Sequence, residues 1–162
     1  MAKFHFPLQP ALDKAVADRK QCEIELVDLQ NRLSEQKSLL LTLEKKLAET
    51  VQRIESEHDN LSAAMGSPSH SEELARRNRF IDSLQNRADR ERNEVREQAN
   101  RVSLLEVQLD EKRQELSERI GAVKALENLK EQKHQAFKQE QTKREERQRD
   151  DDAIQQWNRN NK

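Results

Sequence analysis

Residues 26–61 read LVDLQNRLSEQKSLLLTLEKKLAETVQRIESEHDNL, and an aliphatic side chain returns in them at every seventh position. Counted backwards, the same row reaches Leu12 with Arg19 as its only exception. A companion row, three residues later each time, mixes leucines with polar residues such as Gln36 and Thr50. Apolar residues at these two spacings are the a and d positions of a coiled-coil helix. The stretch therefore predicts a long helix with a narrow apolar seam.

A second apolar row with the same spacing begins at Leu74 and ends at Val123. Its members are Leu74, Ile81, Ala88, Val95, Val102, Leu109, Leu116 and Val123. In its companion row, Leu84 and other leucines alternate with polar residues such as Glu91 and Gln98. Each predicted helix thus has one nearly complete apolar row and one interrupted row, which indicates a thin seam of modest stability.

Gly, Ser and Pro cluster between the two stripes, in residues 63–71. Gly66 is suited to end the first helix, and Pro68 prevents its continuation. Ser69 and Glu72 have the spacing of a capping box at the start of the second helix. This segment is therefore the predicted turn.

The predicted fold is all-α: two long helices in an antiparallel coiled-coil hairpin with a C-terminal helical overhang. We expect one coiled-coil domain over residues 1–162. Its first helix is predicted at about 8–62, its turn at 63–71 and its second helix at about 72–158.

Closing the hairpin about this turn places Leu33 near Val102 and ends the first helix opposite about residue 130. The rest of the second helix then has no intramolecular partner. It carries Phe137, Ile154 and Trp157, which this pairing leaves without a partner inside the chain. Exposed apolar groups on a helix are candidates for insertion into another protein.

The composition excludes several classes of function. Basic and acidic residues nearly balance, at 30 and 31, so the chain as a whole lacks the basic excess that is typical of a dedicated nucleic-acid binder. No apolar run approaches the roughly 20 residues that span a bilayer, and the start at Met1 lacks the apolar region of a secretory signal. A cytoplasmic protein is the expectation, and the single Cys22 gives no sign of an oxidising compartment.

Residues able to carry chemistry are few and scattered. The four histidines, His5, His58, His70 and His134, do not form a metal-ligand pattern. Cys22 occupies a d position and is interpreted as a small core residue. With no Gly-rich phosphate loop and no nucleophile elbow, we expect neither enzymatic activity nor a cofactor.

Three short motifs appear in a characteristic order. They are Phe4-His5-Phe6-Pro7-Leu8 at the start, Phe80-Ile81-Asp82-Ser83-Leu84 early in the second helix, and the charged block of residues 146–153. In this order, and over essentially the whole chain, the sequence resembles the flagellar type III export coiled-coil protein, the FliJ family. The opening motif favours this flagellar family over the related virulence-secretion stalk, which shares the shape.

The resemblance implies a stalk or adaptor subunit of the flagellar export apparatus, acting in flagellum biogenesis, protein transport, motility and chemotaxis. Its implied partners are the hexameric export ATPase, the cytoplasmic domain of the export gate, and export chaperones. The protein would regulate the ATPase and couple ATP hydrolysis to export. It would lie at the cytoplasmic face of the inner membrane, associated with the membrane through its partners only.

Two groups of binding residues follow from the resemblance. The gate-binding residues would be Leu40, Leu47, Val51, Phe80 and Leu84. The residues that bind the ATPase ring would be Phe4, Phe6, Leu8, Phe137, Arg147, Asp151, Ile154 and Trp157. Arg87 and Glu91 depart from the apolar continuation expected of the gate-binding face.

A structural alternative stays open at this stage. The same heptads are compatible with a parallel homodimeric coiled coil that acts as a spacer, with residues 66–71 as its hinge. Gln36 and Gln98 would then set the register of that dimer.

Overall fold

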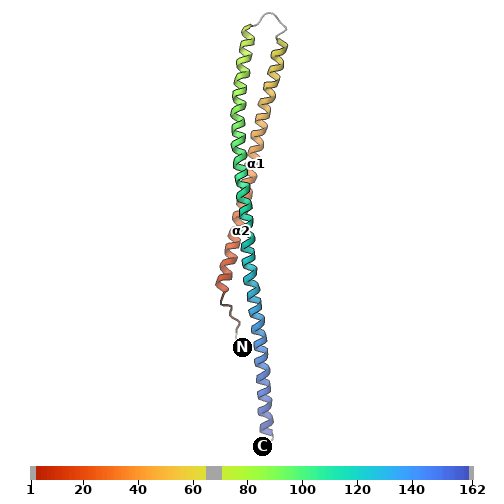
Figure 1. The fold of residues 1–162 in the computed structure, drawn as a ribbon. Helices are drawn as coiled ribbons and strands as arrows, with labels where there is room; N and C mark the ends of the chain where they lie inside the picture. Colours follow the sequence, from red (N-terminus) through yellow and green to blue (C-terminus); the bar gives the residue numbers. More distant parts are fainter. Residues whose placement is uncertain (1–2, 65–70, 161–162) are drawn as a thin grey trace. The chain divides into compact units, whose positions relative to one another are not determined.

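The computed structural model describes residues 3–64 and 71–160. Two helices occupy most of these residues: α1 spans Gln9–Ala64 and α2 spans Ser71–Asn160 (Figure 1). Each helix differs from its predicted range by one residue at its start and two at its end. The described residues contain no strand, and α1 packs against α2. The predicted all-α helical hairpin is confirmed.

The predicted turn lies largely outside the described residues. This holds for Gly66, Pro68 and Ser69, to which the sequence assigned the end of one helix and the capping of the next. Those assignments stay predictions.

Residue contacts divide the chain into two units. The first unit contains residues up to Ile24 together with those from Arg113 onward, and the second contains Glu25–Lys112. Within each unit, a part of α1 lies beside an antiparallel part of α2 (Figure 1).

The apolar core of the second unit comes from both heptad rows. Leu33 of α1 is buried in one cluster with Val102 and Leu109 of α2, so the predicted neighbourhood of Leu33 and Val102 is confirmed. The residues packed around this cluster are Leu26, Leu29, Leu40 and Leu105. Fully burying a side chain of this size stabilises the fold by about 1.5–3 kcal/mol. The burial of these rows is therefore a large stabilising contribution to this unit.

A pair of amide side chains, the buried Gln98 and the half-buried Gln36, interrupts the same seam. Gln98 donates hydrogen bonds from Nε2 to Oε1 of Gln36 at 2.8 Å and to its backbone oxygen at 3.1 Å. At the edge of the seam, Lys37 and Glu106 form an ion pair at 2.7 Å. The two glutamines thus satisfy each other within one chain, as a hairpin requires.

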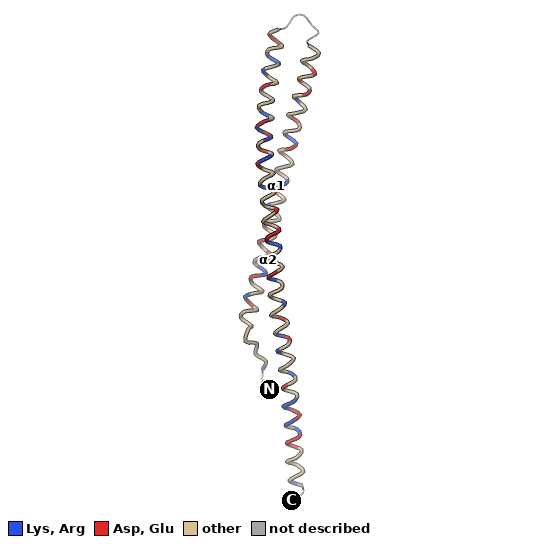
Figure 2. Tube along the Cα trace, in the orientation of Figure 1, with Lys and Arg blue, Asp and Glu red and all other residues tan. Residues whose placement is uncertain are grey.

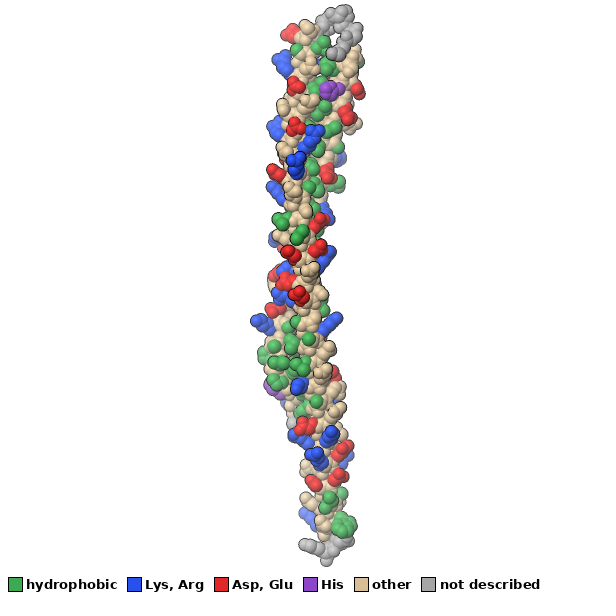
Figure 3. All heavy atoms as spheres, viewed as in Figure 1, with side chains coloured by type: hydrophobic (Ala, Val, Ile, Leu, Met, Phe, Trp, Pro, Cys, Tyr) green, Lys and Arg blue, Asp and Glu red, His purple; other side chains and the backbone are tan. Residues whose placement is uncertain are grey.

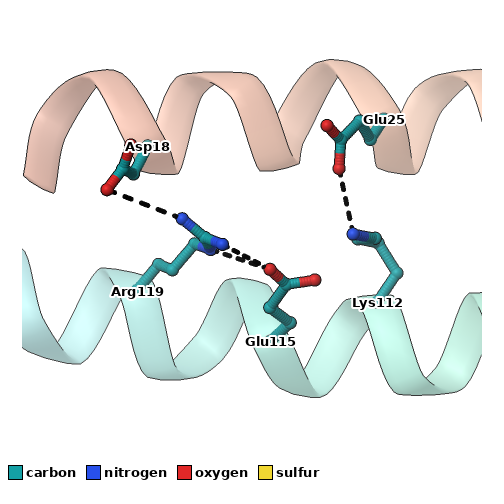
Figure 4. Close-up of polar contacts among 5 residues, drawn as sticks. All are labelled: Asp18, Glu25, Lys112, Glu115 and Arg119. Carbon is teal, nitrogen blue, oxygen red and sulfur yellow. Dashed lines mark hydrogen bonds and ion pairs between the residues drawn. The ribbon is translucent and has the colours of Figure 1, made fainter.

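The first unit has a smaller core, in which Leu12, Cys22 and Val123 are buried. Cys22 thus lies in the seam, as its d position predicts. Beside this core, Asp18 of α1 lies 3.9 Å from Arg119 of α2, and Arg119 donates to Glu115 at 2.5 Å (Figure 4). The hydrogen bond to Glu115 raises the pKa of Arg119 above its already high ordinary value.

The non-helical residues 3–8, here called the N-terminal arm, continue the pairing beyond α1. The Phe4 ring lies 4.9 Å from the His134 ring and 5.7 Å from the Phe137 ring, measured between centroids. The expectation that Phe137 has no intramolecular partner is therefore wrong. An extended chain advances about 3.3 Å per residue against 1.5 Å in a helix, so a short arm covers more than two turns of α2. The unpaired part of α2 begins after Phe137 rather than near residue 130.

Candidate functional site

The five predicted gate-binding residues do not share one surface. Leu40 and Leu47 are a positions and Leu84 is a d position, and all three face the seam. Leu84 is buried, whereas the two α1 leucines are half-buried. The remaining two, Val51 and Phe80, lie outside the seam at an e and a g position.

The e and g positions lie on opposite flanks of the seam, because in an antiparallel pair each e position faces an e position and each g position faces a g position. The contacts follow this rule. Lys37 and Glu106, which form an ion pair, are both e residues. Arg53 and Phe80, which stack on each other, are both g residues. Val51 and Phe80 therefore lie on opposite flanks of the seam.

We define the e flank as the e and b positions of residues 44–58 and 75–92. It contains a groove of about 460 Å³. The groove is lined by Val51, Ile54, Glu55, Gln85, Ala88, Asp89 and Arg92. Its apolar floor thus has a polar rim, in which Asp89 and Arg92 form an ion pair at 2.7 Å.

We define the g flank as the g and c positions of residues 42–56 and 76–90. Here the guanidinium carbon of Arg53 lies 5.6 Å from the centroid of the Phe80 ring, within the range of a cation–π interaction. A cavity of about 110 Å³ lies alongside. It is lined by Lys46, Glu49, Thr50, Arg53, Leu84 and Arg87. This flank therefore combines an exposed aromatic ring with several cations.

Behind the g flank, Glu91 is buried in the seam at 3% exposure. Arg87 donates from Nε to its Oε1 at 2.9 Å, and Nζ of Lys46 lies 3.6 Å from the same oxygen. Burial alone would raise the pKa of Glu91, but the hydrogen bond from Arg87, the Thr50 hydroxyl and the charge of Lys46 together lower it. Glu91 is therefore a buried anion whose cationic partners reach the surface.

Heptad position was the signal that could have separated these residues in the sequence. Val51 follows an a position by four residues, and Phe80 precedes one by a single residue. Grouping the residues by hydrophobicity alone ignored this difference. Heptad position would also have identified Arg53 as the g-position neighbour of Phe80. The sequence interpretation missed this residue.

Four of the residues predicted to bind the ATPase ring lie at the N-terminal arm. Phe6 is buried, Phe4 and Phe137 are half-buried against each other, and Leu8 is exposed. A cavity of about 280 Å³ opens beside the arm. It is lined by Phe4, Leu12, Glu127, Lys130, Glu131 and His134. Phe4 thus holds the arm on α2 through its contact with Phe137, and Leu8 is the most accessible of the four residues.

The other four lie on the last part of α2 and are all exposed. Arg147 and Asp151 belong to its charged block, and Ile154 and Trp157 are 58% and 66% exposed. Charges of both signs alternate along this helix (Figure 2), and hydrophobic side chains gather again close to its C-terminal end (Figure 3). Two large apolar side chains three residues apart thus face solvent on a helix with no packed side.

Neither a metal site nor a membrane span is present in the part of the chain that the structure describes. No three His, Cys, Asp or Glu side chains in residues 3–64 and 71–160 come together to hold a metal ion. Over the same residues, no stretch of helix is long and apolar enough to cross a bilayer.

A two-helix hairpin with exposed apolar groups outside its seam defines a class of protein by its fold: the two-helix coiled-coil proteins. Within this class, the model of the flagellar FliJ protein family matches residues 4–162. The chain belongs to that family. No curated protein and no solved structure matches it. Membership assigns the chain a role in flagellar protein export, as a non-catalytic component.

Proposed function

We propose that this chain is the stalk subunit of the flagellar type III export apparatus, which binds the hexameric export ATPase and the cytoplasmic domain of the export gate. In this function it regulates the ATPase and couples ATP hydrolysis to export. It also transfers export chaperones to the machinery. It acts in the cytoplasm, at the inner face of the membrane through its partners, and serves flagellar assembly, motility and chemotaxis. Nucleic acid is not among its partners.

The observation that carries the proposal is the end of α2. After Phe137 the helix continues to Asn160 with almost every side chain exposed, and it presents Ile154 and Trp157 to solvent. A helix without a packed side is expected to be stabilised by a partner, because most helical stability in proteins comes from tertiary contacts. The central opening of a ring of ATPase subunits would provide such contacts on all sides.

Replacing Ile154 and Trp157 together by Asp tests the ring contact. We expect the variant to lose stimulation of the purified export ATPase, because two buried charges would replace two apolar anchors. The helical content of the variant, measured by circular dichroism, should stay unchanged.

The matched control replaces Ile24 and Val107 by Asp. These side chains are 65% and 53% exposed, close to the values for Trp157 and Ile154, but they lie far from the end of α2 in sequence. The control should stimulate the ATPase like the unmodified protein. Equal stimulation by both double variants would refute the ring contact.

A further inference from the structure

We propose that the g flank is a docking surface for an acidic peptide segment that carries an aromatic or aliphatic anchor residue. The inference deepens the proposed gate contact and rests on it only for the identity of the protein that would supply the segment. The surface and the chemistry of its ligand follow from charge, burial and ring contacts on this flank.

The charges of the g flank are strongly one-sided. Basic side chains occupy five of its positions and an acidic side chain occupies one. The basic residues are Lys46, Arg53, Arg76, Arg87 and Arg90, and the acidic residue is Glu49. All six are exposed. For a chain with a net charge of −1, this is a marked local excess of positive charge.

The anion that balances part of this charge is hidden from a ligand. Glu91 is paired with Arg87 and Lys46 but is itself buried. The side chains of Arg87 and Lys46, by contrast, are 50% and 47% exposed. An approaching ligand therefore meets the cations first. Both cations are also held in place by the carboxylate behind them, which reduces the side-chain entropy that binding would cost.

The apolar contact on this flank is Phe80, which is 38% exposed. Arg53 stacks against its ring and thus places a guanidinium group beside the aromatic surface. The adjoining cavity, between Leu84 and the cations, has a volume of about 110 Å³. An apolar side chain flanked by carboxylates would fit this surface, with its anchor on Phe80 and its acids on the arginines.

The opposite flank carries the reverse charge and explains why the ligand would choose one side. Acidic side chains occupy four positions of the e flank and a basic one occupies a single position. The acidic residues are Glu44, Glu55, Asp82 and Asp89, and the basic residue is Arg92, which pairs with Asp89. The e flank would repel an acidic segment. The charges of the two flanks together therefore direct such a segment to the g flank.

The test uses two short fluorescein-labelled peptides in which Leu and Trp alternate with Glu in one and with Lys in the other. Fluorescence anisotropy should show that the Glu peptide binds the full chain more tightly than the Lys peptide does. Binding should weaken as salt concentration rises, because the contacts are exposed charges.

The decisive variant is Arg53→Glu combined with Arg90→Glu. Neither change removes a partner of the buried Glu91, and Arg90 donates only to the Asn86 backbone oxygen among its described contacts. We expect affinity for the Glu peptide to fall at least about tenfold, as expected when two exposed attractions become repulsions. Phe80→Ala should also weaken binding, but without changing its salt dependence.

The matched control is Lys45→Glu combined with Arg79→Glu, which makes the same change in net charge at f positions of the same two helices. It should retain binding of the Glu peptide. If the two double variants lose affinity for the Glu peptide equally, the peptide is attracted by the net charge of the whole chain. The docking surface would then be refuted. Absence of Glu-peptide binding would refute it too.

The same variants separate this inference from the proposed function. Binding of the gate domain to the unmodified protein and to Arg53→Glu/Arg90→Glu alike, with no binding of the Glu peptide, would refute the acidic ligand and leave the gate contact standing. Binding of the Glu peptide but not of the gate domain would support the docking surface and refute the gate as its source.

Discussion

The seam of the second unit differs along its length. Around Leu33 and Val102 it is a repeating apolar stripe, whereas Gln98 and Glu91 place an amide and a carboxylate in the companion row of the same seam. A stripe of leucines resembles itself after a shift of one heptad, but a paired amide and a bridged carboxylate find their partners in one register only. The apolar stretch therefore supplies stability, and the polar stretch specifies alignment.

The largest effect is expected for Leu33→Ala, which removes a side chain from the centre of the apolar stretch. We expect the free energy of unfolding to fall by about 2–5 kcal/mol, through lost burial and the cavity that remains. Urea denaturation measures this change. Leu41→Ala, at an exposed position eight residues away, should cost less than about 0.5 kcal/mol and serves as the control. Equal losses would contradict the burial of Leu33 in the core of this stretch.

A smaller effect is expected for Arg87→Ala in the polar stretch. The change removes a hydrogen bond to the buried Glu91 and leaves Lys46 as its remaining cationic partner at 3.6 Å. We expect a loss of about 1–3 kcal/mol, the cost of leaving a buried polar group poorly satisfied. Arg90→Ala, which leaves Glu91 untouched, should be nearly neutral in the same denaturation experiment. A neutral Arg87→Ala would show that Glu91 does not depend on this bond.

Acid should weaken the polar stretch selectively. The pKa of Glu91 is lowered from its ordinary value of 4.5, so its contribution is fully present above that value and is lost as the pH falls through the lowered pKa. Relative to a Glu91→Gln variant, the unmodified protein should lose stability below about pH 4.5. Melting temperatures of both proteins across this range measure the effect. Parallel curves would show that Glu91 titrates alike in the folded and unfolded states.

The smallest change in stability is expected when Gln36 and Gln98 are both replaced by Leu. Exchanging both partners of a hydrogen-bonded pair for apolar groups of similar shape can be nearly neutral or stabilising. The expected cost is in specificity, since the seam would then permit shifted pairings and association between chains. Light scattering should detect larger species in the variant. A strictly monomeric and less stable variant would contradict the assignment of these glutamines to register.

The heptad rows were enough to predict the hairpin, because seam residues are identified by spacing and hydrophobicity together. Leu33, Val102 and Cys22 lie where that pattern places them. The candidate surfaces were not predicted correctly, because the residues were grouped by hydrophobicity and not by heptad position, which places Val51 and Phe80 on opposite flanks. The contact of Phe4 with Phe137 was missed because helical pairing arithmetic does not apply to an extended arm.

The final part of α2 has a consequence for the rate at which a partner binds. Its side chains after Phe137 are almost all exposed, so docking there displaces water and does not require a packed intramolecular contact to open first. Association can then proceed without a prior conformational step, at a rate set by diffusion and orientation. The arm-covered turns around His134, by contrast, become accessible only after Phe4 leaves. A ring closing on this helix would therefore engage it from the C-terminal end first.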